Sequence, residues 1–256
     1  MQLHRFYLPP ERCREDILQL DGQEARHALR VLRLEFGSEA IVLDGVGNEF
    51  FCKVENTSRD SLLLRVKKKS FVSPPPCSLG LFIAIPRGKI IESIIQKSVE
   101  LGARRIVPLL TERVVTRLDE ESAAHKREQW QQVAIEAMKQ SGAAWLPEIE
   151  TPAPIQNFLA RREKPELQLV GSLQKERRHL RDIFHEYEKA QAHPPQTAAA
   201  WIGPEGDFTP DELKSIQDGG AHPISLGNLV LRVETAAIYC LSILNYKFNV
   251  SAAKQT

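Results

Sequence analysis

Short apolar runs alternate with amphipathic stretches along most of the chain, and the two spacings predict strands and helices in turn. Beyond residue 78, strands are expected at 78–86, 104–110, 167–170, 198–202 and 223–226. The segments between and after them predict helices at 89–102, about 119–141, 175–190, 209–220 and 233–248. Because strands that alternate with helices form mainly parallel sheets covered on both faces, the fold class expected for this part is α/β.

The first 70 residues have a different pattern, which predicts mostly β structure. Three β-rich runs at 40–45, 49–56 and 61–66 are separated by the turn sequences DGVGN and TSRD. Before them, residues 22–37 place Ala25, Leu29 (or Ala28), Leu32 and Phe36 at helical spacing. A small, half-open β-rich barrel with one or two helices is expected.

A proline-rich segment separates these two parts. Residues 70–78 read SFVSPPPCS, and three consecutive prolines favour an extended segment and exclude a helix. The predicted organisation is therefore a β-rich domain over 1–70, a linker over 71–78 and an α/β domain over 79–250.

Composition narrows the class of protein more by what it lacks than by what it contains. The chain has 256 residues, 42% of them hydrophobic, without an apolar run or signal-peptide pattern that would direct it to a membrane, so a cytoplasmic protein is expected. The four cysteines and seven histidines show no metal-ligand spacing, and no metal is expected. With a net charge of +1, any nucleic acid must be bound by local clusters of basic residues.

Three of the predicted strands end in glycine-led loops, at 171–173, 203–206 and 227–228. Ligands of open parallel sheets bind beyond the carboxyl ends of the strands, and glycine lets the main chain approach them closely. One such loop is commonplace, whereas three at corresponding strand ends predict a shared pocket. Neither GxGxxG nor GxxxxGK[ST] occurs, which disfavours an ordinary dinucleotide or P-loop phosphate site.

Two helix entrances near these loops have different interpretations. Thr209, Pro210 and Glu212 form a strong helix start, to which we assign no chemistry. The last helix is apolar on nearly every face from Ala236 to Leu244, so it must be buried in the core or in a subunit interface. Arg232 and Glu234 precede it, and they are either a solvated helix start or part of a site.

A basic stripe is predicted on the first helix, because Arg26, Arg30 and Arg33 recur at i, i+4 and i+7 with His27 beside them. Stripes of this kind are more often solvated faces than binding sites. A local cluster of cations is nevertheless what phosphate contacts require, and Arg5 is a further candidate.

Several motifs, in order and over essentially the whole chain, resemble a known family. GPEGDFTPDE followed by SLGNLVLRVETA resembles the bacterial 16S ribosomal RNA uridine-N3 methyltransferases of the SPOUT superfamily. Residues 95–114, 140–149 and 27–37 resemble further segments of that family. The combination is highly specific.

The resemblance implies a PUA-like RNA-binding domain followed by a SPOUT methyltransferase domain whose C-terminus forms a trefoil knot. It also implies a homodimer, S-adenosylmethionine as cofactor, and methylation of N3 of one uridine in 16S ribosomal RNA of the small subunit. Cofactor-binding residues would be Gly171, Gly203, Pro204, Glu205, Gly206, Leu226, Gly227, Asn228 and Leu231. Arg232 would act on the reacting base, with Glu234 orienting it, and the RNA-binding residues would be Arg5, Arg26, His27, Arg30 and Arg33.

The sequence departs from the family pattern at two places. Asp207 stands where the family usually has the last glycine of GPEGG, and Ala143, Ala144 and Trp145 follow QSG where an arginine is usual. Two other functions stay open. One is another SPOUT reaction, such as ribose 2′-O-methylation; the other is a non-catalytic RNA-binding factor of ribosome assembly.

Overall fold

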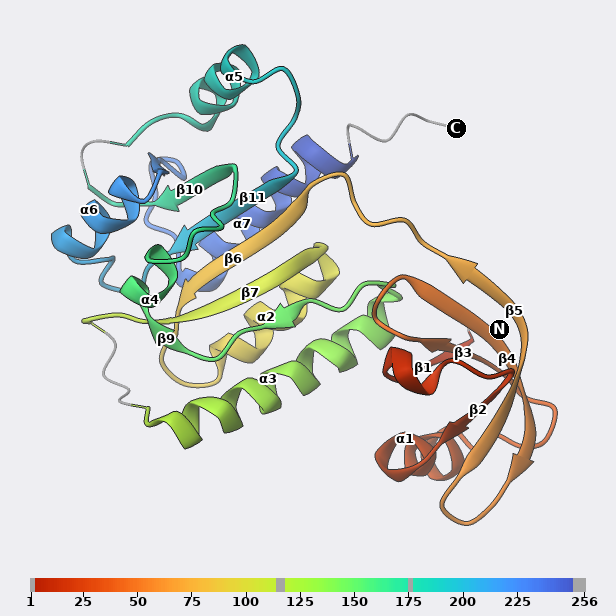
Figure 1. Ribbon diagram of the computed structural model, residues 1–256. Coiled ribbons are helices and arrows are strands. Elements are labelled where there is room, and N and C mark those ends of the chain that lie inside the picture. The colour runs from red at the N-terminus through yellow and green to blue at the C-terminus, as the bar shows by residue number, and fades with distance from the viewer. Residues whose placement is uncertain (1–2, 114–117, 175–176, 251–256) are drawn as a thin grey trace. The chain divides into compact units, whose positions relative to one another are not determined.

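A computed structural model of the chain describes residues 3–113, 118–174 and 177–250. The chain divides into two units, each with its own β-sheet (Figure 1). The first unit comprises the chain up to Pro74 together with Ile135–Leu146, and the second comprises Pro75–Ala134 and the chain from Pro147 onward.

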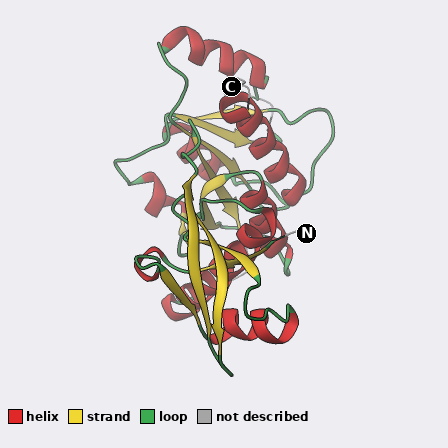
Figure 2. Ribbon diagram, turned by 90° about the vertical axis from the view of Figure 1, so that its right-hand side faces the viewer, coloured by secondary structure: helices red, strands yellow, loops and turns green. Residues whose placement is uncertain are grey.

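The first unit is built on a five-stranded sheet in the order β1-β3-β4-β5-β2. Its strands are β1 (His4–Tyr7), β2 (Ile17–Leu20), β3 (Glu39–Leu43), β4 (Asn48–Thr57) and β5 (Leu62–Phe71). Only the pair β1–β3 is parallel, and the long β4–β5 hairpin is prominent in Figure 2. The three runs expected to be β-strands are confirmed, whereas β1 and β2, with four residues each, were too short to predict.

The prediction of a helix over 22–37 is wrong for its second half. A 3₁₀ turn (Pro10–Arg12) lies earlier in the chain, and α1 (Gly22–Arg26) continues only as a π-helical turn, His27–Val31. Arg33 then takes a left-handed backbone with φ of 53°, the conformation that ends many helices, usually at glycine. Phe36 consequently lies outside the helix and is 78% exposed.

The segment around Trp145 belongs to the first unit and fills a space left by Gly47. The Trp145 indole N–H donates to the carbonyl of Val72 at 2.9 Å, and its ring meets Phe71 edge-on. A Cβ at Gly47, whose φ is 99°, would lie 2.7 Å from the Trp145 ring. The tryptophan that departs from the family pattern therefore has a structural role, anchoring residues 135–146 to the first sheet.

The second unit contains a seven-stranded sheet in which every strand pair is parallel. Its main path is β12-β10-β11-β6-β7-β8, and β9 also pairs with β7. The strands are β6 (Ser78–Ala84), β7 (Ala103–Leu110), β8 (Glu148–Ile149), β9 (Ala153–Pro154), β10 (Leu167–Gly171), β11 (Thr197–Ile202) and β12 (Ala221–Ile224). The predicted α/β class with a mainly parallel sheet is confirmed.

Helices follow the strands, and all of them except the short helix Ile155–Leu159 were predicted from the spacing. They are α2 (Ile90–Glu100), α3 (Glu120–Ser141), α4 (Ile155–Leu159), α5 (Leu180–Ala190), α6 (Pro210–Asp218) and α7 (Val233–Asn245), which ends in a π-helical turn, Tyr246–Val250. The start expected for α5 at 175 falls on residues outside the described part of the chain. No helix in the described part is long and apolar enough to cross a membrane.

The path of the last 50 residues positions the site. After β11 the chain forms α6 and then β12, which pairs with β10 at the edge of the sheet. Residues 225–232 return from that edge to α7, which packs against the central strands β6 and β11 and against α2. On α7 the side chains of Ala236, Ala237, Cys240, Leu241 and Leu244 are buried, whereas Tyr239 is 43% exposed, so the burial on all sides that the apolar sequence predicts is met on one face only.

Candidate active site

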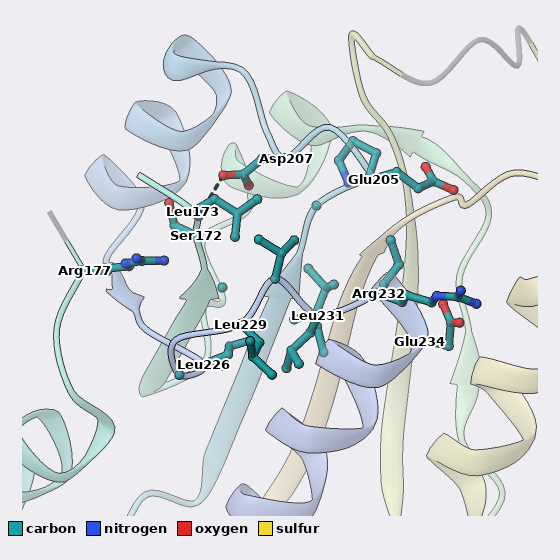
Figure 3. A pocket seen from close by; sticks show the side chains of 18 of the residues that line it. Ser172, Leu173, Arg177, Glu205, Asp207, Leu226, Leu229, Leu231, Arg232 and Glu234 are labelled. Atoms are coloured by element: carbon teal, nitrogen blue, oxygen red, sulfur yellow. Dashed lines mark hydrogen bonds between the residues drawn. The ribbon is translucent and has the colours of Figure 1, made fainter. Parts of the chain in front are cut away.

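The three glycine-led loops meet at one end of the second sheet and enclose a pocket of about 360 Å³ (Figure 3). They meet because β12, β10 and β11 are neighbours and parallel, so their carboxyl ends lie side by side. This volume is in the range of small-molecule sites, and the place is where open α/β sheets bind ligands.

Most of the predicted site residues line this pocket. They are Gly171, Gly203, Pro204, Glu205, Leu226, Gly227, Leu231, Arg232 and Glu234. Gly206 and Asn228 belong to the same loops but are not among the lining residues.

Sequence reasoning missed other residues of the lining, of which Ser172, Ile202 and Asp207 directly adjoin a glycine. They are Ser172, Leu173, Ile202, Asp207, Leu229 and Val230 on the loops, Arg177 after β10, Ile90 at the start of α2, and Val233 and Ala236 on α7. Position next to a strand-end glycine was the available signal for the loop residues. Ile90 comes from a distant helix and had no such signal.

Two of the glycines are required by the shape of their loops. A Cβ at Gly203 would lie 2.9 Å from the backbone nitrogen of Phe208, because the GPEGDF loop returns tightly upon itself. Gly227 has φ of 112°, which side-chain-bearing residues rarely adopt. The loops can therefore present main-chain groups to a ligand at positions where a larger residue would distort them.

The pocket combines an apolar interior with charged groups at its edges. Leu226, Leu229 and Leu231 gather below the GPEGDF loop in Figure 3, while Arg177 lies on one side and Arg232 with Glu234 on the other. Leu229 and Val230 are 80% and 74% exposed, unusually high fractions for apolar residues that line a pocket. A small ligand with both apolar and polar parts fits this arrangement.

Arg232 is the N-cap residue of α7, and its exposed side chain does not cap the helix. Glu234 lies beside it in the first turn (Figure 3). Among the ion pairs of the described residues, Arg232 and Glu234 do not form one with each other. The Arg232 guanidinium is thus directed to the pocket edge, next to a helix N-terminus that also favours negative charge.

The acidic residues of the neighbouring loop have structural partners. Glu205 accepts a hydrogen bond from the backbone N–H of Arg87 at 3.3 Å, which links the GPEGDF loop to the loop after β6. Glu212 and Thr209 form the predicted capping box of α6, and Glu212 also accepts from the backbone N–H of Glu112 at 2.8 Å. The interpretation of Thr209, Pro210 and Glu212 as a helix start is confirmed.

The predicted RNA-binding residues lie in the first unit with different degrees of exposure. Arg26, His27 and Arg30 are exposed on α1 and the π-helical turn. Arg33 is exposed but lies beyond the helix, so the single helical stripe of three arginines is wrong. Arg5 is half-buried, and its guanidinium lies 3.0 Å from the place of a Cβ on Gly142.

Within the described ranges, no group of three histidine, cysteine, aspartate or glutamate side chains is arranged to hold a metal ion. All four cysteines are free and buried.

Comparison with protein families matches both units of the chain. Residues 73–245 match the RNA methyltransferase domain, and residues 20–67 match the RNA methyltransferase PUA domain. Two relatives named ribosomal RNA small subunit methyltransferase E illustrate the similarity. The one from Synechocystis is 31% identical over 94% of this chain and 77% of its own length, and the one from Bacillus subtilis is 28% identical over 89% of each.

Solved structures agree with these matches over nearly the whole chain. A methyltransferase from Legionella pneumophila, in complex with the cofactor S-adenosylmethionine, has a TM-score of 0.85 and 33% identity, covering 96% of this chain and 98% of its own. A ribosomal RNA small subunit methyltransferase E from Neisseria gonorrhoeae, bound to S-adenosylmethionine, has a TM-score of 0.84 and 25% identity, covering 97% and 99%.

Proposed function

Because the chain belongs to the RNA methyltransferase family that includes the ribosomal RNA small subunit methyltransferase E proteins, we propose that it methylates N3 of a uridine in 16S ribosomal RNA with S-adenosylmethionine. Membership of the family confirms the resemblance seen in the motifs, whereas the N3 position of the methyl group belongs to the proposal. The single observation that carries the proposal is the pocket formed by the loops after β10, β11 and β12.

The residues of this pocket fit S-adenosylmethionine. Leu226 and Leu231 offer apolar surface for the adenine or the methionine part, and the loops at Gly171, Gly203 and Gly227 expose main-chain donors and acceptors at close range. The same pocket contains no pyrophosphate-binding motif, in keeping with a cofactor that has no phosphate.

The cofactor, when bound, supplies an activated methyl group on a positively charged sulfur. The protein then mainly has to align the reactants, since holding two groups in reactive geometry lowers the barrier substantially. Uracil N3 carries a proton and is paired in a duplex, so the uridine must be unpaired or turned out toward the pocket.

Arg232, which lines the pocket, would assist the step in which N3 becomes the nucleophile. Loss of the N3 proton leaves negative charge on the uracil ring, and an adjacent cation and helix N-terminus both stabilise such charge. Glu234, two residues further along the chain, would orient the Arg232 side chain when the substrate is bound. With S-adenosylmethionine bound, the methyl group would pass from its sulfur to N3, and the N3 proton would be released to solvent.

RNA would be held by the first unit through its exposed cations. Arg26, His27, Arg30 and Arg33 supply phosphate contacts, and Arg5 contributes from a more enclosed position. A ribosomal substrate also fits the expected cytoplasmic location.

A homodimer is part of the proposal. Leu229 and Val230 line the pocket yet are largely exposed, and Tyr239 and Tyr246 are exposed on α7 and the turn that follows it. A second copy of the chain placed against α7 would cover these side chains and complete one wall of the pocket.

Transfer of tritium from labelled S-adenosylmethionine to ribosomal RNA tests the proposal against a non-catalytic assembly factor. Purified small subunits lacking the modification should gain label in 16S ribosomal RNA when the protein is added. Binding of the subunit without any transfer of label, under conditions in which the cofactor is bound, would establish the assembly factor instead.

A further inference from the structure

Asp207 has a backbone conformation that suits glycine. It is one of only two non-glycine residues in the described ranges with positive φ, at 63°, in the loop where the family resemblance leads one to expect GPEGG. Aspartate and asparagine tolerate this left-handed region better than other side chains, but it still favours glycine. The aspartate must offer something that glycine cannot.

Its carboxylate connects two of the loops that form the pocket. Oδ2 accepts a hydrogen bond from the backbone N–H of Leu173 at 2.9 Å, shown as the dashed line in Figure 3. Oδ1 accepts from the backbone N–H of Phe208 at 2.8 Å. Leu173 lies 34 residues earlier, after β10, so one side chain holds the β10 loop against the β11 loop.

Arg113 fixes the other side of the same loop. From the segment after β7, its Nη1 donates to the carbonyl oxygens of Gly206 and Asp207, the latter at 3.2 Å. The peptide groups around Asp207 are therefore held by the arginine, while its carboxylate holds Leu173. Both tied loops contribute to the pocket lining, through Ser172 and Leu173 on one side and Pro204 and Glu205 on the other.

We propose that Asp207 is a positioning residue that sets the spacing of the two cofactor-binding loops before the cofactor arrives. The inference rests on the proposed function in one respect, that the ligand is S-adenosylmethionine. A pocket already ordered in the free protein binds more tightly, because less conformational freedom is lost on binding. Hydrogen bonds to a charged carboxylate are strong enough to hold such loops.

The test compares Asp207→Gly and Asp207→Asn with the wild-type protein. Glycine relieves the backbone conformation but removes both hydrogen bonds, whereas asparagine keeps one acceptor oxygen for the two N–H groups. The control is Asp211→Ala, an exposed acidic residue in the first turn of α6. Cofactor affinity is measured by calorimetry on protein stripped of ligand, and amide exchange at Leu173 is measured without ligand.

In Asp207→Gly we expect the Kd for S-adenosylmethionine to rise about tenfold, with faster exchange of the Leu173 amide. Asp207→Asn should fall between glycine and wild type in both measurements, and Asp211→Ala should match wild type. The melting temperature should change much less than the exchange rate of the Leu173 amide, which separates loop positioning from a general loss of stability.

Two results would overturn the proposal. Wild-type cofactor affinity and wild-type exchange of the Leu173 amide in Asp207→Gly would show that the hydrogen bond between Asp207 and Leu173 does not position the loops. Equal loss of affinity in both variants with unchanged Leu173 exchange would instead identify a direct contact between the carboxylate and the cofactor. Failure of the wild-type protein itself to bind S-adenosylmethionine would contradict the proposed function. Exchange of the Leu173 amide would still show whether Asp207 holds the two loops together.

Discussion

Arg232 stands at the N-cap of α7 with an exposed guanidinium at the pocket edge. If it stabilises charge on the deprotonated uracil, Arg232→Ala should lower kcat at saturating cofactor by about 100-fold, the usual effect of removing one such group. The Kd for S-adenosylmethionine should stay within about twofold, because the lost interaction is with the RNA base.

Single-turnover methylation of small subunits measures this effect. Arg181→Ala, which removes an exposed arginine on α5, is the matched control and should retain full activity. Wild-type turnover in Arg232→Ala would remove the residue from the chemistry.

The buried thiols predict how stability depends on pH. Burial raises the pKa of the Cys240 thiol to about 12 from an ordinary value of 9.0, and that of Cys52 likewise to about 12. Above pH 9 the unfolded thiols lose protons that the folded ones keep, so stability is full below pH 9 and falls as pH rises toward 12. The slope is about 1.4 kcal/mol per pH unit for each such thiol.

Denaturant unfolding at pH 8 and pH 10 checks this linkage. The loss of unfolding free energy between the two pH values should be about 1.4 kcal/mol smaller in Cys240→Ala than in wild type. An identical loss in the two proteins would show that Cys240 titrates normally.

For single residues, the sequence predicted the unusual backbone conformations that glycine adopts. It did not predict those adopted by other residue types. Gly203 and Gly227 were identified from their positions at strand ends, and their tight or left-handed backbone confirms the reason for glycine there. Asp207 and Arg33 adopt positive φ without glycine. The Asp207 conformation is held by contacts with Arg113 and Leu173 from other segments, which no local pattern reveals.

At the scale of elements, α1 and the turn after it carry the proposed RNA contacts. Reversing Arg26, Arg30 and Arg33 to glutamate should abolish salt-sensitive RNA binding and leave the cofactor Kd unchanged, because phosphate contacts are lost while the pocket lies in the second unit. Filter binding at several salt concentrations measures the change.

A control that reverses Arg14 and Arg59, which are exposed elsewhere in the first unit, should weaken RNA binding much less per reversed charge. Equal effects of the two sets would point to a general field of positive charge. Unchanged RNA affinity in the triple variant would refute the assignment of these arginines.

The elements themselves were predicted best where their periodicity was long. Strands β3 to β7 and β10 to β12, and helices α2, α3, α6 and α7, lie close to their expected ranges. The first helix was overextended because Leu32 and Phe36 continued its spacing, while Arg33 turned the chain away. Strands β8 and β9 have two residues each, and only their pairing with β7 defines them.

At the scale of the whole molecule, the exposed apolar groups on α7 and beside the pocket predict a homodimer. Tyr239→Asp, on α7 and outside the pocket lining, should shift sedimentation toward the 28.9 kDa monomer. It should also weaken cofactor binding, because Leu229 and Val230 would lose their cover. Phe36→Asp, which changes an exposed aromatic residue of the first unit, should leave the dimer intact.

A wild-type protein that sediments as a monomer at micromolar concentration, yet binds cofactor fully, would contradict the dimer.

The alternation of strands and helices in the sequence predicted the fold class. It did not predict that residues 225–232 return to α7. Periodicity specifies faces of elements and not the route between them, so this part of the expected architecture came from the family resemblance.

The position of the transferred methyl group distinguishes N3 methylation from ribose 2′-O-methylation, and nucleoside mass spectrometry identifies that position. Small subunits incubated with the protein and S-adenosylmethionine are digested to nucleosides and compared with synthetic standards. A new 3-methyluridine from 16S ribosomal RNA is expected, and the Arg232→Ala protein should form it about 100-fold more slowly. A ribose 2′-O-methylated nucleoside in its place, or no new methylated nucleoside at all, would contradict the proposed N3 methylation.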